Sequence, residues 1–241
     1  MSGHSKWATI KRKKAKVDAA RGKVFTQLAK EILLAAKQGG GDPDGNLRLK
    51  NAIAKAKEAN IPNDNIQRAI MKGTGELGGG SYEEILYEGY GPGGVAVMVE
   101  ATTNNRNRTA GEVRHLFSKN GGNLGESGCV AWMFEKKGMI VIEKDTGADE
   151  DDLMMAALDS GAEDVRVEDD VFEIITDPGI FDTVRDGLEE KGYQLAEAQV
   201  SMLPTNTVKI EGAQAEQMLK LLDSLEELDD VDGVYTNFDM D

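Results

Sequence analysis

The residues with the clearest chemistry are cations near the N-terminus. Five of them occupy a stretch of six positions: Lys11, Arg12, Lys13, Lys14 and Lys16. Ammonium and guanidinium groups at this density bind phosphate polymers in a salt-dependent manner, without reading a base sequence. The alternative is a solvated helix face. We favour phosphate contact because Asp18 and Glu31 are the only acids before residue 42.

The charge of the 241-residue chain is divided along its length. Residues 1–75 hold 16 Lys and Arg against 6 Asp and Glu, a net charge of +10. The remaining residues hold 12 against 37, a net charge of −25. A dense positive field attracts polyanions such as DNA or RNA. The division therefore predicts a cationic head that binds nucleic acid and an acidic body.

A smaller basic cluster lies within the acidic part. Thr103–Thr109 contains Arg106 and Arg108 and precedes an expected helix over 109–120 that carries Arg114. Polar side chains and free amides at a helix N-terminus form a site for anions. The alternative is that Asn and Thr cap the helix while Arg106 and Arg108 pair with neighbouring acids. The residues favour the two interpretations about equally.

Other kinds of chemistry find little support. His4 and His115 have no cysteine or carboxylate at metal-ligand spacing, and Cys129 lies in an apolar run typical of a buried residue. Gly89–Gly94 lies between expected strands, so a hairpin turn is favoured over a phosphate-binding loop. The acids of 145–152 lack the pattern of a calcium loop. We therefore expect no catalytic residues, metal, cofactor or small-molecule substrate, and no enzymatic activity.

The composition also bounds the cellular location. No apolar run approaches the roughly 18 residues that a membrane span needs, and the N-terminus lacks the apolar stretch of a secretory signal. A single cysteine forms no disulfide within the chain, which fits a reducing compartment. These features predict a soluble cytoplasmic protein with no membrane partner.

The cations of the head must be positioned by helices. The expected helices cover 7–20, which ends before Gly22, then Val24–Ala36, 46–60 and a short segment from Pro62 to Gly73. The first of them is polar on all sides, so it either stands in solvent or lies on a partner. Gly78–Ser81 follows as a flexible boundary.

Beyond this boundary the periodicity alternates between strand and helix. Strands are expected over 84–90, 95–100, 130–135, 139–143, 164–168, 171–176, 195–203, 207–211 and 234–238, and helices over 109–120, 150–160, 180–191 and 213–228. Lys136–Gly138 is expected to be a turn. From residue 139 to 203 the order is β-α-β-β-α-β, the split βαβ pattern.

The two flanks of this unit are too small to form stable domains alone, so we expect them to pair with each other around it. The predicted fold is α+β, with a helical N-terminal domain followed by two α+β domains, one inserted in the other. The predicted boundaries are 1–77 for the basic helical domain, 78–135 plus 205–241 for the discontinuous domain, and 136–204 for the inserted ferredoxin-like domain.

Several motifs closely resemble the YebC/PmpR family along essentially the full length of the chain. They are Gly3–Trp7, Arg21–Lys23, Gly39–Pro43, Asn60–Ile66, Tyr87–Gly94, Asn105–Thr109 and Gly121–Gly125. Thr102 and Asn104 depart from the pattern, where an apolar residue and Asp are usual. The resemblance implies a cytoplasmic three-domain protein. The family is described as probable transcriptional regulators that bind DNA, its mitochondrial relatives are translational activators, and bacterial members are linked to ribosomes stalled on proline-rich stretches.

Charge and resemblance together predict a nucleic-acid-binding regulator, with DNA and transcription placed first. The alternative is a ribosome-associated factor that binds ribosomal RNA and relieves stalling. It is favoured by the absence of an obvious helix-turn-helix and by the all-round polarity of the arm. Trp7 either stacks on a base or anchors the arm. The residues expected to bind nucleic acid are Lys6, Trp7, Lys11, Arg12, Lys13, Lys14, Lys16, Arg21, Lys23, Arg106, Arg108 and Arg114.

Overall fold

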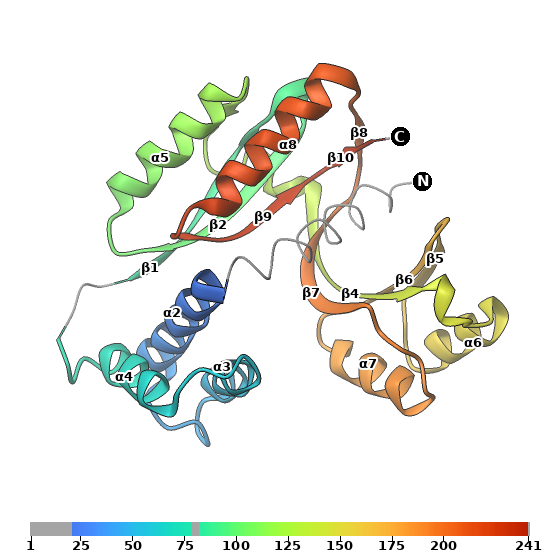
Figure 1. Ribbon diagram of the computed structural model, residues 1–241, viewed down its shortest axis with the longest axis horizontal. Coiled ribbons are helices and arrows are strands. Elements are labelled where there is room, and N and C mark those ends of the chain that lie inside the picture. Colours follow the sequence, from blue (N-terminus) through green and yellow to red (C-terminus); the bar gives the residue numbers. More distant parts are fainter. Residues whose placement is uncertain (1–20, 79–81, 241) are drawn as a thin grey trace.

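The structure, a computed structural model, describes residues 21–78 and 82–240, with side chains from residue 23 onward. The predicted helix over 7–20 and most of the predicted linker lie outside these residues. The predicted α+β class is confirmed: a helical N-terminal region is followed by sheets with helices (Figure 1). The domain boundaries stay a prediction. None of the described helices has the length and apolar character needed to cross a lipid bilayer.

The helical region consists, in the described residues, of α2 (Arg21–Gly39), α3 (Leu47–Glu58) and α4 (Asn63–Gly73). The helix predicted from Val24 therefore begins at Arg21 or before it, and Gly22 lies inside α2. The side chain of Asn46 caps α3 by accepting from the Leu49 N–H at 3.1 Å. Apolar faces of all three helices meet in one core that includes Ile32, Leu49 and Ile66.

The first sheet contains β1 (Glu83–Tyr90), β2 (Ala96–Thr103), β3 (Asn123–Leu124) and β9 (Val231–Thr236) in the antiparallel order β3-β1-β2-β9. The helices α5 (Arg106–Lys119) and α8 (Gly212–Glu227) supply Phe117 and Met218 to a core with Val97 and Val99 of β2. The predicted hairpin turn is confirmed, because Gly91–Gly94 joins β1 to β2 and Gly93 has a φ of 74°.

The C-terminal strands differ in length from the prediction. The strand expected over 207–211 shortens to β8 (Val208–Lys209), which pairs in parallel with β10 (Phe238–Asp239). The strand expected from residue 234 begins at Val231 instead, and forms β9 at the edge of the first sheet.

The second sheet contains β4 (Phe134–Glu143), β5 (Asp164–Val167), β6 (Val171–Thr176) and β7 (Glu197–Pro204) in the antiparallel order β5-β6-β4-β7. The helices α6 (Glu150–Asp159) and α7 (Phe181–Glu190) pack through Leu153 and Leu188 onto Ile140 and Ile174. The predicted β-α-β-β-α-β order over 139–203 is confirmed, and it forms the split βαβ arrangement of ferredoxin-like folds.

The turn predicted at Lys136–Gly138 is wrong, because β4 runs without interruption from Phe134 to Glu143. Its first residues pair only with β7, and β6 joins on the other side from Gly138 onward. Charged side chains are therefore placed where the strand has a single neighbour. A strand edge of this kind tolerates lysine.

A buried carboxylate of β1 holds the segment that leads from the first sheet to the second. Glu88 is 3 % exposed and accepts hydrogen bonds from the backbone N–H groups of Gly128, Val130 and Ala131 at 2.6, 2.9 and 2.7 Å. Burial raises the pKa of this carboxyl, but the three bonds together outweigh burial and lower the pKa. Glu88 thereby fixes the short 3₁₀ turn Ala131–Met133, from which β4 begins.

Candidate nucleic-acid interface

The predicted binding residues of the arm lie outside the described part of the chain. They are Lys6, Trp7, Lys11, Arg12, Lys13, Lys14 and Lys16. Arg21 lies at the start of α2, and Lys23 follows within the same helix. Within the described residues, the interface can therefore be built from α2, α3, α4 and the start of α5.

The α2 residues Lys23, Gln27 and Lys30 donate to the end of α8 and to the loop and strand that follow it. Their spacing of four and three residues places them on one side of the helix. The Lys23 ammonium donates to the carbonyls of Glu226 and, at 2.9 Å, Leu228. The Gln27 amide donates to the Val231 carbonyl at 3.0 Å. The last carbonyls of a helix lack intrahelical partners and form the negative end of its dipole, so cations are favoured there.

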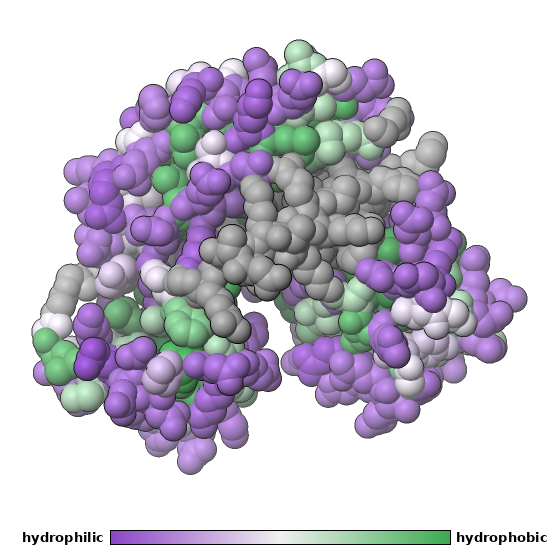
Figure 2. Space-filling view, viewed as in Figure 1, coloured by the Kyte–Doolittle hydropathy of each residue, from purple (hydrophilic) through white to green (hydrophobic). Residues whose placement is uncertain are grey.

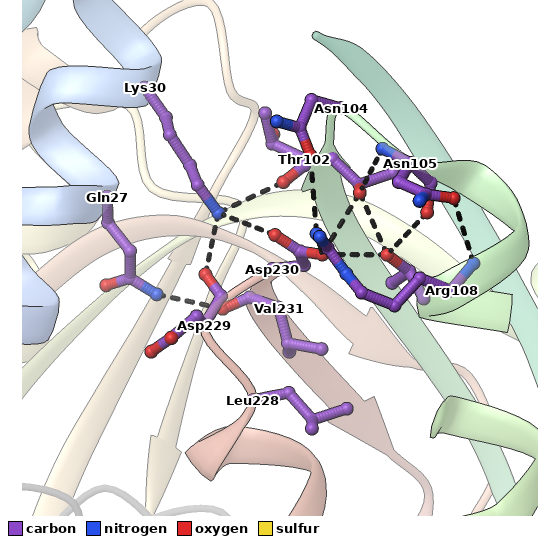
Figure 3. A network of polar contacts seen from close by, with 12 residues as sticks. Gln27, Lys30, Thr102, Asn104, Asn105, Arg108, Leu228, Asp229, Asp230 and Val231 are labelled. Atoms are coloured by element: carbon purple, nitrogen blue, oxygen red, sulfur yellow. Dashed lines mark hydrogen bonds and ion pairs between the residues drawn. The ribbon is translucent and has the colours of Figure 1, made fainter. Parts of the chain in front are cut away.

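Lys30 extends this contact into the first sheet (Figure 3). Lys30 is buried, with 8 % of the residue exposed. Its ammonium donates to the carbonyls of Thr102 and Asp229 at 3.0 and 2.6 Å. It also lies 3.4 Å from Oδ1 of Asp230. Lys23 thus holds the helical region against the end of α8, and Lys30 holds it against the first sheet. The predicted role of Lys23 in binding nucleic acid stays a prediction.

Asp230 also accepts hydrogen bonds from residues of β2 and α5. Its Oδ2 accepts from the Arg108 guanidinium at 2.7 Å and from the hydroxyls of Thr103 and Thr109 at 3.0 and 2.7 Å. Burial alone raises the pKa of this carboxyl, but these bonds together with Lys30 lower the pKa to about 2. Asp230 is therefore an ionised centre shared by the helical region and α5 (Figure 3).

The basic cluster at the start of α5 is arranged around this carboxylate. The helix begins at Arg106, three residues before the predicted start, because the Asn105 side chain accepts from the Arg108 N–H at 3.1 Å and caps the helix. Arg106 lies 3.7 Å from Glu83. The structure therefore contains the arrangement of the second interpretation, in which Asn105 caps the helix and Arg106 and Arg108 pair with acids. Binding of nucleic acid by Arg106 and Arg108 stays a prediction.

Arg114 differs from these two arginines. It lies on an exposed position of α5 and forms no ion pair with any residue of the described ranges. Its predicted role in binding nucleic acid is therefore compatible with its position and stays a prediction.

Arg48 makes a second contact between the helical region and the first sheet that the sequence did not indicate. It donates to Glu31 of α2 at 2.7 and 2.9 Å and to Glu84 of β1 at 2.7 Å. These bonds raise the pKa of Arg48 and lower the pKa of Glu84. A cleft of ≈ 640 Å³ lies between the two layers and is lined by Arg48, Lys55, Glu84 and Asp232. No local signal marks these residues, because their partners are distant in sequence.

Five other cations of the helical region are exposed and form no ion pair with the described residues. They are Lys50, Lys55 and Lys57 of α3 and Arg68 and Lys72 of α4. They are spread over two helices rather than clustered, so no dense run of charge marks them in the sequence. Figure 2 shows that hydrophilic residues cover most of the visible described surface. These five cations are available to an external anion.

The described residues offer no arrangement for a bound metal, since none of their His, Cys, Asp and Glu side chains gather in a group of three or more with ligand geometry. Cys129 is half-buried, and burial raises the pKa of its thiol. A raised thiol pKa disfavours the reactive thiolate.

Comparison with known proteins covers nearly the whole chain. Residues 5–76 match the family described as "TACO1/YebC protein N-terminal domain", and residues 82–238 match "TACO1/YebC second and third domain". A relative from Pelotomaculum thermopropionicum is 64 % identical over 242 residues and covers 100 % of both chains. One from Syntrophus aciditrophicus is 60 % identical and covers 100 % of this chain and 96 % of its own. Both are named "Probable transcriptional regulatory protein".

A solved structure has the same fold. The crystal structure of the conserved hypothetical protein Aq1575 from Aquifex aeolicus matches with a TM-score of 0.80 and 50 % sequence identity. The match covers 94 % of this chain and 93 % of that one.

Proposed function

Because the chain belongs to the TACO1/YebC family, we propose that it is a regulatory protein that binds nucleic acid through its N-terminal helical region, and that its ligand is DNA in the control of transcription. The choice of DNA follows the names of the relatives, which describe probable transcriptional regulatory proteins. In this proposal the protein acts by binding and catalyses no reaction.

The observation that supports this proposal is the division of charge along the chain, together with the exposed cations of the helical region that form no ion pair with the described residues. The first 75 residues have a net charge of +10 and the rest a net charge of −25. Of the described cations in the helical region, Lys23 contacts the end of α8, and Lys30 and Arg48 contact the first sheet and the loop before β9. The five exposed cations of α3 and α4 have no described ion-pair partner. Phosphate groups attracted to the region would meet these free charges, and the acidic sheets would repel them.

The second candidate function is binding of ribosomal RNA by a translation factor. The distribution of Lys11, Arg12 and Lys14 around a predicted helix favours it, because an all-round cationic arm suits a cleft lined by RNA. Charge alone treats the two ligands alike, since both are phosphate polymers.

The deciding experiment is crosslinking in living cells, followed by sequencing of the DNA and the RNA bound to the protein. The proposal expects enrichment at promoter DNA. Enrichment at ribosomal RNA without promoter peaks would replace it by the translation factor. Recovery of neither would contradict both.

A binding assay tests the role of the head. Changing Lys11, Lys13 and Lys14 to Ala should weaken binding to DNA and reduce the slope of log affinity against log salt by about 3. The matched control changes three exposed lysines of the acidic part, Lys119, Lys136 and Lys220, to Ala, with the same loss of charge. If both variants behave alike, the head is not the binding surface.

A further inference from the structure

A groove of ≈ 340 Å³ lies on the helical region between α2 and α4, on residues that the sequence analysis did not assign to any site. Its walls include Phe25 and Tyr82, both half-buried, and its floor includes the apolar side chains of Leu33 and Ala69. The volume lies within the range of sites that hold small organic groups. The groove therefore offers aromatic and apolar surface to a flat ligand.

The rim of the groove is polar and cationic on one side. Asn65, Arg68 and Lys72 of α4 line it, and their spacing of three and four residues places them in one row along the helix. All three are exposed. Arg68 and Lys72 form no ion pair with the described residues, in contrast to Lys30 and Arg48, whose charges are used against the first sheet. The rim thus presents two positive charges and an amide beside an apolar floor.

This combination matches the chemistry of a nucleotide. Aromatic side chains stack on the faces of bases, an asparagine amide hydrogen-bonds a base edge, and cations one turn apart bind backbone phosphates. A base inside a duplex has both faces covered by its neighbours and cannot enter such a groove. The ligand must therefore present an unstacked base, as a single strand or a loop does.

We propose that the groove between α2 and α4 binds one unstacked nucleotide of a single-stranded nucleic acid, with the base against Phe25 and Tyr82 and the flanking phosphates on Arg68 and Lys72. This inference rests on the proposed function, in which the helical region binds nucleic acid, and adds the form in which the ligand is bound. The shared chemistry is that of a single strand, which can be DNA or RNA.

The phosphate contacts are tested by fluorescence anisotropy with the full chain and labelled twelve-nucleotide single strands, one of DNA and one of RNA. The double variant Arg68→Ala/Lys72→Ala should bind at least about 10-fold more weakly than the wild type, with a salt slope reduced by about 1.4 for two phosphates on a single strand. The matched control is Lys136→Ala/Lys220→Ala in the acidic part, which removes the same charge from exposed positions away from the groove. Its affinity should fall less than about 3-fold.

The base contact is tested with strands of equal phosphate charge that lack bases. The wild type should bind an abasic strand about 10-fold more weakly than the intact one, within the range measured for stacking on aromatic residues. Tyr82→Leu should remove much of this preference, and its circular dichroism spectrum should match that of the wild type. Whichever of DNA and RNA shows the larger loss with the abasic strand is the source of the nucleotide.

Three results separate the inference from the proposed function. If the wild type binds neither single strands nor duplexes, the proposed function fails. If it binds nucleic acid but treats abasic and intact strands alike, or if the Arg68 and Lys72 variant binds like its control, the inference is wrong and the proposed function stands. A preference for duplex over single strand likewise overturns the inference alone.

Discussion

Lys30 and Asp230 meet at 3.4 Å across the boundary between the helical region and the first sheet. They lie 200 residues apart in sequence. The same carboxylate binds Arg108 at 2.7 Å, so one acid neutralises cations from two separate helices. Lys30 and Arg108 therefore both use their charge in an ion pair within the protein.

Replacing Asp230 by Asn should therefore destabilise the fold. The change leaves the buried Lys30 ammonium without its counter-charge and weakens the bonds to Arg108 and Thr109, which should lower the free energy of unfolding by about 3 kcal/mol. Urea denaturation measures the loss. The neighbouring exposed Asp229→Asn is the control and should change stability by less than about 0.5 kcal/mol. Equal effects from both variants would contradict the prediction.

Asp230 should also make stability depend on acid pH. Its pKa in the folded state is about 2, below the ordinary value of 3.8, so its ionised form favours the folded state. The resulting contribution of about 2 kcal/mol is fully present above pH 4 or so and is lost as the pH falls towards 2. Thermal unfolding at a series of pH values should show a shallower acid limb for Asp230→Asn than for the wild type. Parallel limbs would exclude Asp230 as the cause.

Glu88 should be as important for the connection between the sheets. Glu88→Gln keeps the shape of the side chain but turns an N–H donor towards backbone N–H groups that need an acceptor, which should cost about 2–3 kcal/mol. Hydrogen exchange of the Gly128, Val130 and Ala131 amides should become faster. The exposed Glu112→Gln on α5 serves as control. Unchanged exchange in Glu88→Gln would show that the carboxylate does not hold this segment.

Two glycines at helical positions should respond in opposite directions to the same substitution. A Cβ on Gly73 would lie 2.4 Å from the Leu33 carbonyl oxygen and 2.8 Å from the Ala36 Cβ, so Gly73→Ala should force α4 away from α2 and cost about 1–3 kcal/mol. A Cβ on Gly111 of α5 would meet nothing within 4 Å, so Gly111→Ala should stabilise by about 0.5–1 kcal/mol. The denaturation midpoint should fall below that of the wild type for Gly73→Ala and rise above it for Gly111→Ala. Midpoints that shift in the same direction would refute the prediction.

Hydrophobic periodicity was enough to predict the order of elements in the second sheet, because the helices α6 and α7 bury one apolar face and the central strands β4 and β6 bury apolar runs. Periodicity failed at Lys136 and Lys137, where two charged residues before Gly138 led to the prediction of a turn inside β4. They are compatible with β4 because only β7 pairs with it at that point. Whether a strand has one neighbour or two is a property of the assembled sheet and is absent from the local pattern.

The candidate site was less accessible from the sequence than the fold. The density of cations identified the head, but it did not distinguish cations that are used internally from those that are free. Lys30 and Lys72 look alike in the sequence, and only the position of carbonyl groups and acids some 200 residues later separates them. The aromatic walls of the α2–α4 groove were equally hidden, because Phe25 and Tyr82 are brought together by packing.

The insertion of one sheet within another has a consequence for synthesis of the chain. β2 pairs with β9, where Val97 is opposite Thr236, so the first sheet stays open at that edge until Thr236 has left the ribosome. The inserted second sheet, complete at Pro204, can form before then. The carbonyls that receive Lys23, and Asp230 itself, also emerge late. A nascent chain therefore exposes its helical region, undocked and with Lys30 uncompensated, until Asp230 and β9 have left the ribosome.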